Sequence, residues 1–231
     1  MKAIILAAGK GTRMGELSQN IPKVLIELNG KPFLYYIIKS LDKAGFNDVC
    51  LVVGHKKEKI IDFLEEYSID ATLVEQTEQR GTGHALIEAK EFAGDKPFLV
   101  INGDNLFSPN DLKQLHVKDE FNYTIGKKVK DPSKFGVLVA KGEMLVKIVE
   151  KPKEFVGDLV NLGVYKFTKD IWDALEHVKL SERGEYELTD AITELSIKNK
   201  VKVLKLNDYW LHLGNKEDIL KIEEEMKNLN L

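Results

Sequence analysis

Residues Ala3–Met14 read AIILAAGKGTRM, an apolar run that passes directly into a glycine-rich loop. Ala3–Leu6 are all apolar, and Ala7, Ala8 and Gly9 follow them. A strand that is covered by helices on both faces reads as a continuous apolar run of this kind, so the pattern is typical of a parallel sheet. The stretch therefore predicts a buried strand, with its loop at the sheet edge where open α/β folds bind ligands.

The same pattern recurs twice in the first half of the chain. Val49–Val53 ends at Gly54, and Phe98–Ile101 ends at Asn102 and Gly103. Apolar residues at helical spacing lie between these runs, at residues 34–41, from about residue 57 and at about residues 83–92. This alternation predicts β-α-β units in which the three strands share one sheet.

The second half predicts more strands than helices. Strands are expected at 122–129, 136–140, 145–149 and 160–167, several of them antiparallel, and helices at 169–177, 189–198 and 215–228. We therefore predict a single Rossmann-like α/β domain over residues 1–231, with a mixed, mostly parallel sheet flanked by helices. Its second half is expected to cover the edge of the sheet.

Composition excludes several classes of protein. Of the 231 residues, 43% are hydrophobic and 31% are charged, which excludes collagen-like, coiled-coil and disordered chains. No apolar run has the ~18 residues of a membrane span. The net charge of -3 disfavours a nucleic-acid partner. One cysteine, Cys50, excludes an intrachain disulfide, and the absence of a signal-peptide pattern predicts a reducing, cytoplasmic setting. The oligomeric state is left open, a homo-oligomer included.

The loop after the first predicted strand has the composition of an anion site. Gly9 and Gly11 let backbone N–H groups approach an anion, and Lys10, Arg13 and the later Lys23 supply positive charge. Neither a dinucleotide-binding fingerprint nor a Walker A loop is present. The alternative is a surface turn with incidental cations.

The longer stretch Leu6–Met14, followed by Pro22 and Lys23, resembles the signature of the sugar-1-phosphate nucleotidylyltransferases, and in particular uridylyltransferase domains. The resemblance implies the nucleotide-diphospho-sugar transferase fold. Residues 1–110 would be its nucleotide-binding half, and residues 111–231 its sugar-phosphate half with the C-terminal helix. Implied nucleotide contacts are Leu6, Ala8, Gly9, Gly11, Thr12 and Gly103, and implied catalytic cations are Lys10, Arg13 and Lys23.

A polar segment at residues 76–86 reads QTEQRGTGHAL and precedes a predicted helix. Without a family it indicates only a polar turn, in which His84 is a structural histidine. The segment also resembles the uracil-reading loop of the uridylyltransferases. That resemblance assigns base contacts to Gln76, Gly81 and Thr82, which favours UTP, and dTTP after it, over purine nucleotides.

Asp104 closes the third predicted strand and is the candidate metal ligand. Mg²⁺ usually takes one or two carboxylates together with substrate phosphates, and the resemblance implies the same role. Near the C-terminus the stretch WLHLG at 210–214 carries His212 where several relatives carry Asp. His212 is thus the second candidate metal ligand. Imidazole is a poor Mg²⁺ ligand, so three alternatives stay open: Asp104 and phosphates alone hold the ion, a softer ion such as Mn²⁺ or Co²⁺ is preferred, or activity is weakened.

Four stretches of the second half resemble the sugar-phosphate pocket of the same family, namely FGV at 135–137, EKP at 150–152, NLGVY at 161–165 and GEYELTD at 184–190. The resemblance implies sugar contacts from Gly136, Glu150, Asn161 and Tyr186. It also implies that Lys151 acts as a catalytic cation on the sugar phosphate. These residue types suit the task, because hydroxyls pair with carboxylates and amides, and phosphates with lysine. The alternative is a strand edge with surface Glu and Lys.

Taken together, the motifs predict an enzyme that converts a nucleoside triphosphate and a hexose 1-phosphate, glucose or N-acetylglucosamine, into a nucleotide sugar and pyrophosphate. The expected mechanism is metal-assisted in-line attack on the α-phosphate. Two alternatives stay open: a CTP-dependent cytidylyltransferase of a phospho-alcohol, and a non-catalytic nucleotide-sugar-binding protein. The chain ends at Leu231 without hexapeptide repeats, so acetyl transfer is not expected.

Overall fold

The three apolar runs of the first half form the centre of the sheet. The structure is a computed structural model that describes residues 1–231. Strand β1 (Ala3–Leu6) lies between β4 (Val49–Val53) and β6 (Phe98–Asn102) and runs parallel to both. Strand β5 (Thr72–Glu75) pairs in parallel with the other side of β4. The predicted parallel β-α-β arrangement is confirmed.

The second half continues this sheet, which has nine strands in the order β5-β4-β1-β6-β11-β8-β12-β10-β9. Its strands are β8 (Asn122–Lys128), β9 (Gly136–Lys141), β10 (Met144–Glu150), β11 (Leu159–Phe167) and β12 (Val201–Lys205). Only β10 and β11 run against the others, so the sheet is mixed and mostly parallel, as predicted.

The second half covers the edge of the first-half sheet, as expected, and does so by extending that sheet. Strand β11 pairs directly with β6, with Phe167 opposite Phe98, so the free side of β6 is extended by an antiparallel strand. Beyond it, β9 pairs with β11 as well as β10, through Val137 and Val160. The outer five strands therefore close on one another, which satisfies backbone groups that a free edge would leave unpaired.

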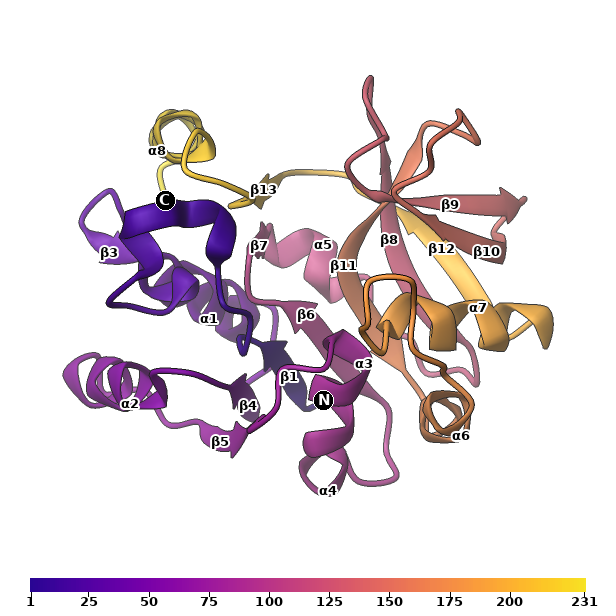
Figure 1. Ribbon diagram of the computed structural model, residues 1–231, viewed down its shortest axis with the longest axis horizontal. Helices are drawn as coiled ribbons and strands as arrows, with labels where there is room; N and C mark the ends of the chain where they lie inside the picture. The colour runs from indigo at the N-terminus through magenta and orange to yellow at the C-terminus, as the bar shows by residue number, and fades with distance from the viewer.

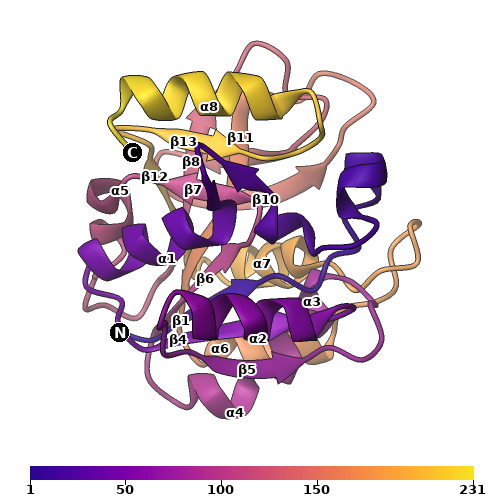
Figure 2. The ribbon, with the colours of Figure 1, turned by 90° about the vertical axis from the view of Figure 1, so that its left-hand side faces the viewer.

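Helices cover both faces of the sheet (Figures 1 and 2). One face carries α1 (Phe33–Lys43), α2 (Lys57–Glu66), α5 (Pro109–Lys113) and α8 (Asp218–Asn228). The other carries α3 (Thr82–Glu88), α4 (Lys90–Ala93), α6 (Asp170–Glu176) and α7 (Leu188–Ile197). The helix predicted at 83–92 is thus two helices that meet at Ala89. None of the helices combines the length and apolar character that a membrane crossing requires.

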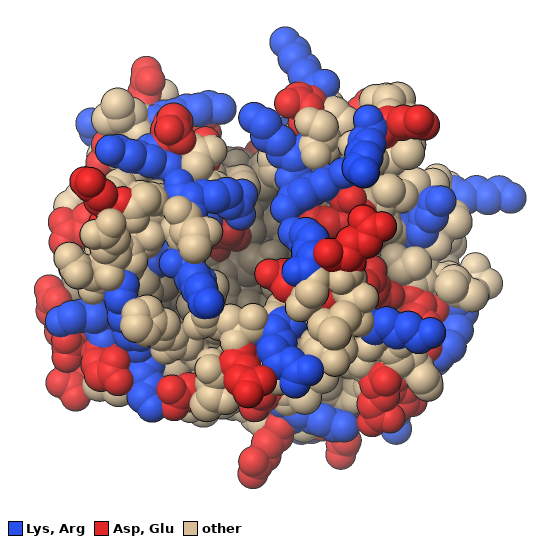
Figure 3. All heavy atoms as spheres, viewed as in Figure 1, with Lys and Arg blue, Asp and Glu red and all other residues tan.

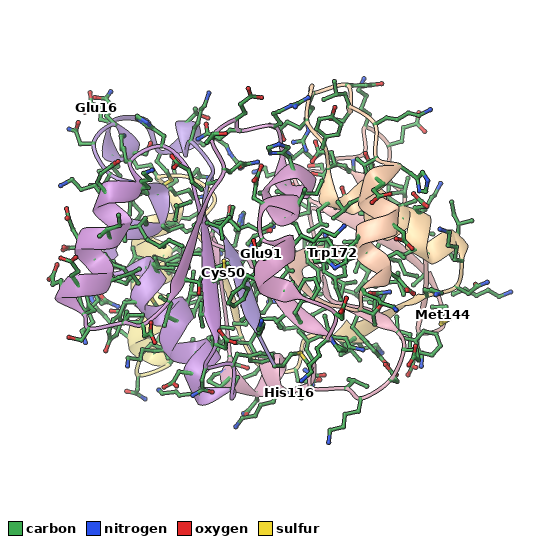
Figure 4. All side chains as sticks on the ribbon, turned by 90° about the horizontal axis from the view of Figure 1, so that it is seen from below. Glu16, Cys50, Glu91, His116, Met144 and Trp172 are labelled. Carbon is green, nitrogen blue, oxygen red and sulfur yellow. The ribbon has the colours of Figure 1, made fainter.

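Alternate residues of the central strands enter two separate cores. Ala3 and Ile5 belong to a cluster of 37 buried residues, whereas Ile4 and Leu6 belong to a cluster of 25 on the opposite face. This division follows from the twofold periodicity of a strand. Cys50 lies in the smaller cluster, in the middle of the molecule (Figure 4), and burial raises the pKa of its thiol to about 12.

Two short helical segments follow the glycine-rich loop. A short 3₁₀ helix spans Thr12–Ser18, and a second one spans Lys23–Leu25. Two small antiparallel pairs complete the fold: β2 (Glu27–Leu28) with β3 (Lys31–Pro32), and β7 (Asn105–Phe107) with β13 (Trp210–His212). The second of these pairs connects the end of β6 to the C-terminal part of the chain.

Candidate functional site

The carboxyl ends of β1, β5 and β6 lead into one cleft. Figure 3 shows this face hollowed between the two halves of the molecule, with Lys and Arg side chains on both sides of the hollow. A cavity of about 470 Å³ lies there. Every residue predicted to contact the nucleotide, together with Asp104, lines this cavity: Leu6, Ala8, Gly9, Lys10, Gly11, Thr12, Arg13, Lys23, Gln76, Gly81, Thr82, Gly103 and Asp104.

A second cavity of about 260 Å³ adjoins the first on the side of the second half. It is lined by most of the residues predicted for the sugar phosphate and by the doubtful metal ligand, namely Gly136, Glu150, Lys151, Asn161 and His212. Tyr186 is the exception and lines neither cavity. Its hydroxyl lies 3.3 Å from the guanidinium of Arg80, and its backbone is bonded to the loop at Arg80–Gly83. Tyr186 therefore supports the loop at Arg80–Gly83, and its contact with the sugar stays a prediction.

Five residues line both cavities, namely Arg13, Thr82, Asn102, Asp104 and Glu185. A ligand in one cavity would therefore meet a ligand in the other beside a guanidinium and two carboxylates. Asn102 contributes a further polar group, because its Oδ1 is buried and has no hydrogen-bond partner within the chain. A buried oxygen of this kind normally has a partner, so its position between the cavities is consistent with a bound ligand or water.

The cations of the cleft are largely free of acidic partners. Lys10 and Arg13 are exposed and make no salt bridge, while Lys23 Nζ lies 3.0 Å from Oδ2 of Asp104. Gly11 allows Lys23 to approach the loop, since a Cβ at Gly11 would lie 2.9 Å from the Cβ of Lys23. Gly11 also has φ +65°, a conformation that glycine adopts without steric cost. The loop thus presents positive charge and backbone amides to an anion.

Asp104 is held by three neighbours. Besides Lys23, Asn105 Nδ2 donates to Oδ1 at 2.8 Å, and His212 Nε2 lies 3.9 Å from Oδ2. Desolvation by itself raises the pKa of Asp104, but Lys23, through its charge and its hydrogen bond, and Arg13, through its charge, act in the opposite direction, and the net effect is to lower it. The pKa of Asp104 therefore lies below its usual value, and the group is an ionised carboxylate at neutral pH.

The pairing of β13 with β7 places His212 next to Asp104. His212 is opposite Asn105 in this ladder, and Trp210 Nε1 donates to Asn105 Oδ1 at 2.7 Å. The His212 ring stacks on Trp210 and contacts Phe135. Desolvation lowers the pKa of His212, against the opposing charge of Asp104, so the imidazole is neutral and able to ligate. No three His, Cys, Asp or Glu side chains gather into a metal site, so a cation here would need ligands from substrates.

Backbone hydrogen bonds from the second half of the chain hold the loop at residues 76–83, here called the base loop after its predicted role. Gly83 N donates to Tyr186 O, and Tyr186 N donates to Arg80 O, both at 2.8 Å. Gly81 has φ +106°, and a Cβ there would lie 2.6 Å from Tyr186 O. Gln76 is only 3% exposed, and its Nε2 donates to Gly81 O at 3.1 Å. The backbone of the second half thus determines the position of a loop from the first half.

The second cavity is also lined by residues that were not assigned from the sequence. Arg183 Nη2 lies 2.6 Å from Oε1 of Glu187 and 4.0 Å from Oε1 of Glu150. Burial raises the pKa of Glu150, and Arg183 and Lys151 oppose the shift. Lys134 and Phe135 also line this cavity. Arg183 could have been found from the sequence, because it is one of only three arginines and directly precedes the GEYELTD stretch.

Gly136 and Lys151 show backbone features that suit this pocket. A Cβ at Gly136 would lie 2.8 Å from Oε2 of Glu150, so a larger residue there would displace that carboxylate from its present position. Lys151 has φ +42°, a region rarely adopted by residues other than glycine, and its N–H donates to Phe135 O at 3.0 Å. The side-chain amide of Asn161, by contrast, is hydrogen-bonded within the chain. Its Nδ2 donates to Tyr165 Oη at 2.6 Å, and its Oδ1 accepts from Thr124 Oγ1 at 3.0 Å.

Comparison with known proteins extends over almost the whole chain. The nucleotidyl transferase family model matches residues 2–228. The bifunctional protein GlmU of Methanocaldococcus jannaschii is 44% identical over 223 residues, which cover 96% of this chain and 53% of GlmU. The chain therefore spans about half the length of the GlmU relatives. UTP–glucose-1-phosphate uridylyltransferase AglF of Haloferax volcanii is 34% identical over 237 residues, covering 98% of this chain and 97% of AglF.

A solved structure shows the same fold. UDP-glucose pyrophosphorylase in complex with UDP-glucose superimposes with a TM-score of 0.88 at 25% sequence identity, covering 99% of this chain and 98% of that chain. The predicted fold class is confirmed by this match.

Proposed function

This chain belongs to the nucleotidyl transferase family, and we propose that it transfers the uridylyl group of UTP to a hexose 1-phosphate with release of pyrophosphate. One observation carries the proposal: two cavities meet at Arg13 and Asp104, one lined by the glycine-rich loop and the other by Glu150 and Lys151. A reaction between two phosphorylated substrates needs this arrangement, because the attacking oxygen and the α-phosphorus must come together at a charged junction.

In the proposed reaction a phosphate oxygen of the sugar 1-phosphate attacks the α-phosphorus of UTP. A new P–O bond forms, the bond to the β-phosphate breaks, and pyrophosphate leaves. The attacking phosphate is already ionised at neutral pH, so no general base is needed. Lys10, Arg13 and the loop amides stabilise the charge that develops on the phosphates, and Lys151 holds the attacking group. Catalysis then rests on positioning and electrostatic stabilisation.

We propose that a divalent cation binds at Asp104. Asp104 is an ionised carboxylate, the type of ligand that Mg²⁺ takes together with substrate phosphates. It lies beside the Lys and Arg side chains of the glycine-rich loop, which would hold those phosphates. When bound, the ion would neutralise charge on the α-phosphate and the leaving pyrophosphate. The neutral imidazole of His212, 3.9 Å from the same carboxylate, extends the donor set towards Mn²⁺ or Co²⁺.

The choice of UTP rests on Gln76, Gly81 and Thr82, which line the first cavity, with dTTP as the next candidate. The names of two similar proteins support a uridine nucleotide, since AglF is a UTP–glucose-1-phosphate uridylyltransferase and the solved structure holds UDP-glucose. For the sugar we propose glucose 1-phosphate or N-acetylglucosamine 1-phosphate. Glu150 and the neighbouring Arg183 would face sugar hydroxyls and phosphate, respectively.

Pyrophosphate release tests the proposal directly. UTP, dTTP, CTP, GTP and ATP are each combined with the 1-phosphates of glucose, N-acetylglucosamine and mannose and with phosphocholine, first with Mg²⁺ and then with Mn²⁺ or Co²⁺. We expect release with UTP and one or both of the first two sugars. Release only with CTP and phosphocholine would instead identify a cytidylyltransferase. Tight binding of a nucleotide sugar with no release in any combination would contradict an enzymatic role and support the binding-protein alternative.

A further inference from the structure

The orientation of the buried Gln76 side-chain amide follows from its neighbours. Its Nε2 lies 3.1 Å from the backbone oxygen of Gly81. A carbonyl oxygen can only accept a hydrogen bond, so the amide nitrogen and not the amide oxygen must face Gly81. The opposite orientation would bring two carbonyl oxygens together in a buried place.

The same nitrogen determines the protonation of His84. Nδ1 of His84 lies 3.0 Å from Gln76 Nε2, which carries hydrogens and donates. His84 Nδ1 must therefore be the unprotonated, accepting nitrogen of the ring. On the other side of the ring, Nε2 lies 3.5 Å from the carboxylate of Glu88, one helical turn further along α3. A carboxylate there favours the proton on Nε2, so both ring nitrogens are assigned by their surroundings.

Both hydrogens of the Gln76 amide are donated to groups within the chain, so only Oε1 is left to bind a ligand. Oε1 makes no hydrogen bond within the chain, and Gln76 lines the first cavity. The backbone N–H of Gly81 likewise donates to no group within the chain. The loop therefore offers a ligand one acceptor, Gln76 Oε1, and one donor, the Gly81 N–H. This pair complements a base edge with an N–H next to a carbonyl, as in uracil and thymine, and opposes the cytosine edge, where the ring nitrogen accepts.

We propose that His84, held by Glu88, is a positioning residue that selects the base by locking the Gln76 amide in this orientation. The inference rests on the proposed function, since it concerns which nucleotide the cleft takes. His84 does not touch the substrate in this account. It removes the alternative amide orientation, in which the nitrogen would face the base and favour cytosine.

The test compares selectivity between nucleotides rather than activity alone. The ratio of kcat/KM for UTP to that for CTP is measured for wild type, His84→Leu and His84→Asn, and binding of each nucleotide without sugar phosphate is measured by calorimetry. Leucine removes the acceptor, whereas the asparagine oxygen can take the place of Nδ1. The matched control is His177→Leu, because His177 also pairs with a glutamate, Nδ1 to Glu194 Oε1 at 3.2 Å, but lines neither cavity.

We expect His84→Leu to lower the UTP-to-CTP ratio at least about fivefold, the equivalent of one hydrogen bond, while His84→Asn retains most of it. His177→Leu should keep the wild-type ratio. A general loss of stability would reduce the use of both nucleotides together and leave the ratio unchanged, and that result would overturn the inference.

An independent measurement avoids any dependence on the variants folding. ¹⁵N spectra of histidine-labelled wild type report which ring nitrogen of His84 carries the proton, and the His84→Asn spectrum identifies its signals. A proton on Nε2 supports the proposal, and a proton on Nδ1 refutes it even if UTP is the substrate. Wild type that binds none of the pyrimidine nucleotides would refute the proposed function, and this inference with it.

Discussion

Arg13 provides the sharpest test of the proposed chemistry. Its guanidinium lines both cavities at the junction and forms no salt bridge, so removing it breaks no contact that supports the fold. We therefore expect the free energy of unfolding of Arg13→Ala to lie within about 0.5 kcal/mol of the wild-type value, as is usual for surface substitutions.

The expected loss of activity follows from the charge at that junction. Two unit charges about 4 Å apart interact by about 4 kcal/mol at the effective dielectric of a partly exposed site. Removing one donor that faces the transition state typically lowers kcat about 100- to 1000-fold. We expect Arg13→Ala to show a loss in this range, and Arg13→Lys to recover only part of it, because lysine lacks the planar fork of donors.

The assay is steady-state release of pyrophosphate, with the free energy of unfolding measured in urea on the same preparations. Lys43→Ala is the control, since Lys43 is an exposed cation at the end of α1 that lines neither cavity of the site. Its activity should equal that of wild type. If Arg13→Ala kept activity within about threefold of wild type, the charge-stabilising role assigned to this junction would be refuted.

Three further outcomes are expected. Lys166→Met should lower the free energy of unfolding in urea by about 3–5 kcal/mol. The reason is that the fully buried ammonium of Lys166 donates to two backbone carbonyls and contacts the Asp119 carboxylate. A loss below about 1 kcal/mol would contradict this prediction. Burial raises the pKa of Glu150 in the folded state, so its contribution to stability is fully present below the ordinary glutamate pKa of 4.5 and is lost as pH rises through the pKa of the folded state. Glu150→Gln should therefore increase the melting temperature at pH 7 relative to wild type more than at pH 4, and an equal change at both would contradict the assignment. His212→Asp adds a second carboxylate beside Asp104 and should raise activity with Mg²⁺ relative to Mn²⁺; an unchanged ratio of the two activities would show that residue 212 does not contact the ion.

Most of the first half of the fold could be predicted from the sequence. β1, β4 and β6 are buried on both faces, and a strand in that environment has a continuous apolar sequence that is visible without a structure. β5 and β12 were missed because each is short and partly exposed, so its pattern does not differ from that of a loop. The extension of the sheet through β11 could not be predicted either, because strand order depends on contacts between distant segments.

The candidate site shows the same division. The residues of the glycine-rich loop, the base loop and Asp104 were identified because short motifs carry their chemistry locally, and the structure brings them to one cleft. The position of Tyr186 outside both cavities could not be predicted, because its motif indicates proximity to the pocket but not the direction of the side chain. The role of His84 could not be inferred either, since its significance lies in a contact with Gln76 across the loop.

The sequence by itself determined the buried strands, the cations, the carboxylate and the family of this protein, because each of these is encoded in residues close together along the chain. Only the tertiary structure decided that two cavities meet at Arg13 and Asp104, that β13 brings His212 beside Asp104, and that the Gln76 amide nitrogen faces the backbone oxygen of Gly81. The physical reason is that these features depend on distances and hydrogen bonds between residues far apart in the sequence. Such contacts are determined by the packing of the whole chain, so local sequence patterns do not predict them.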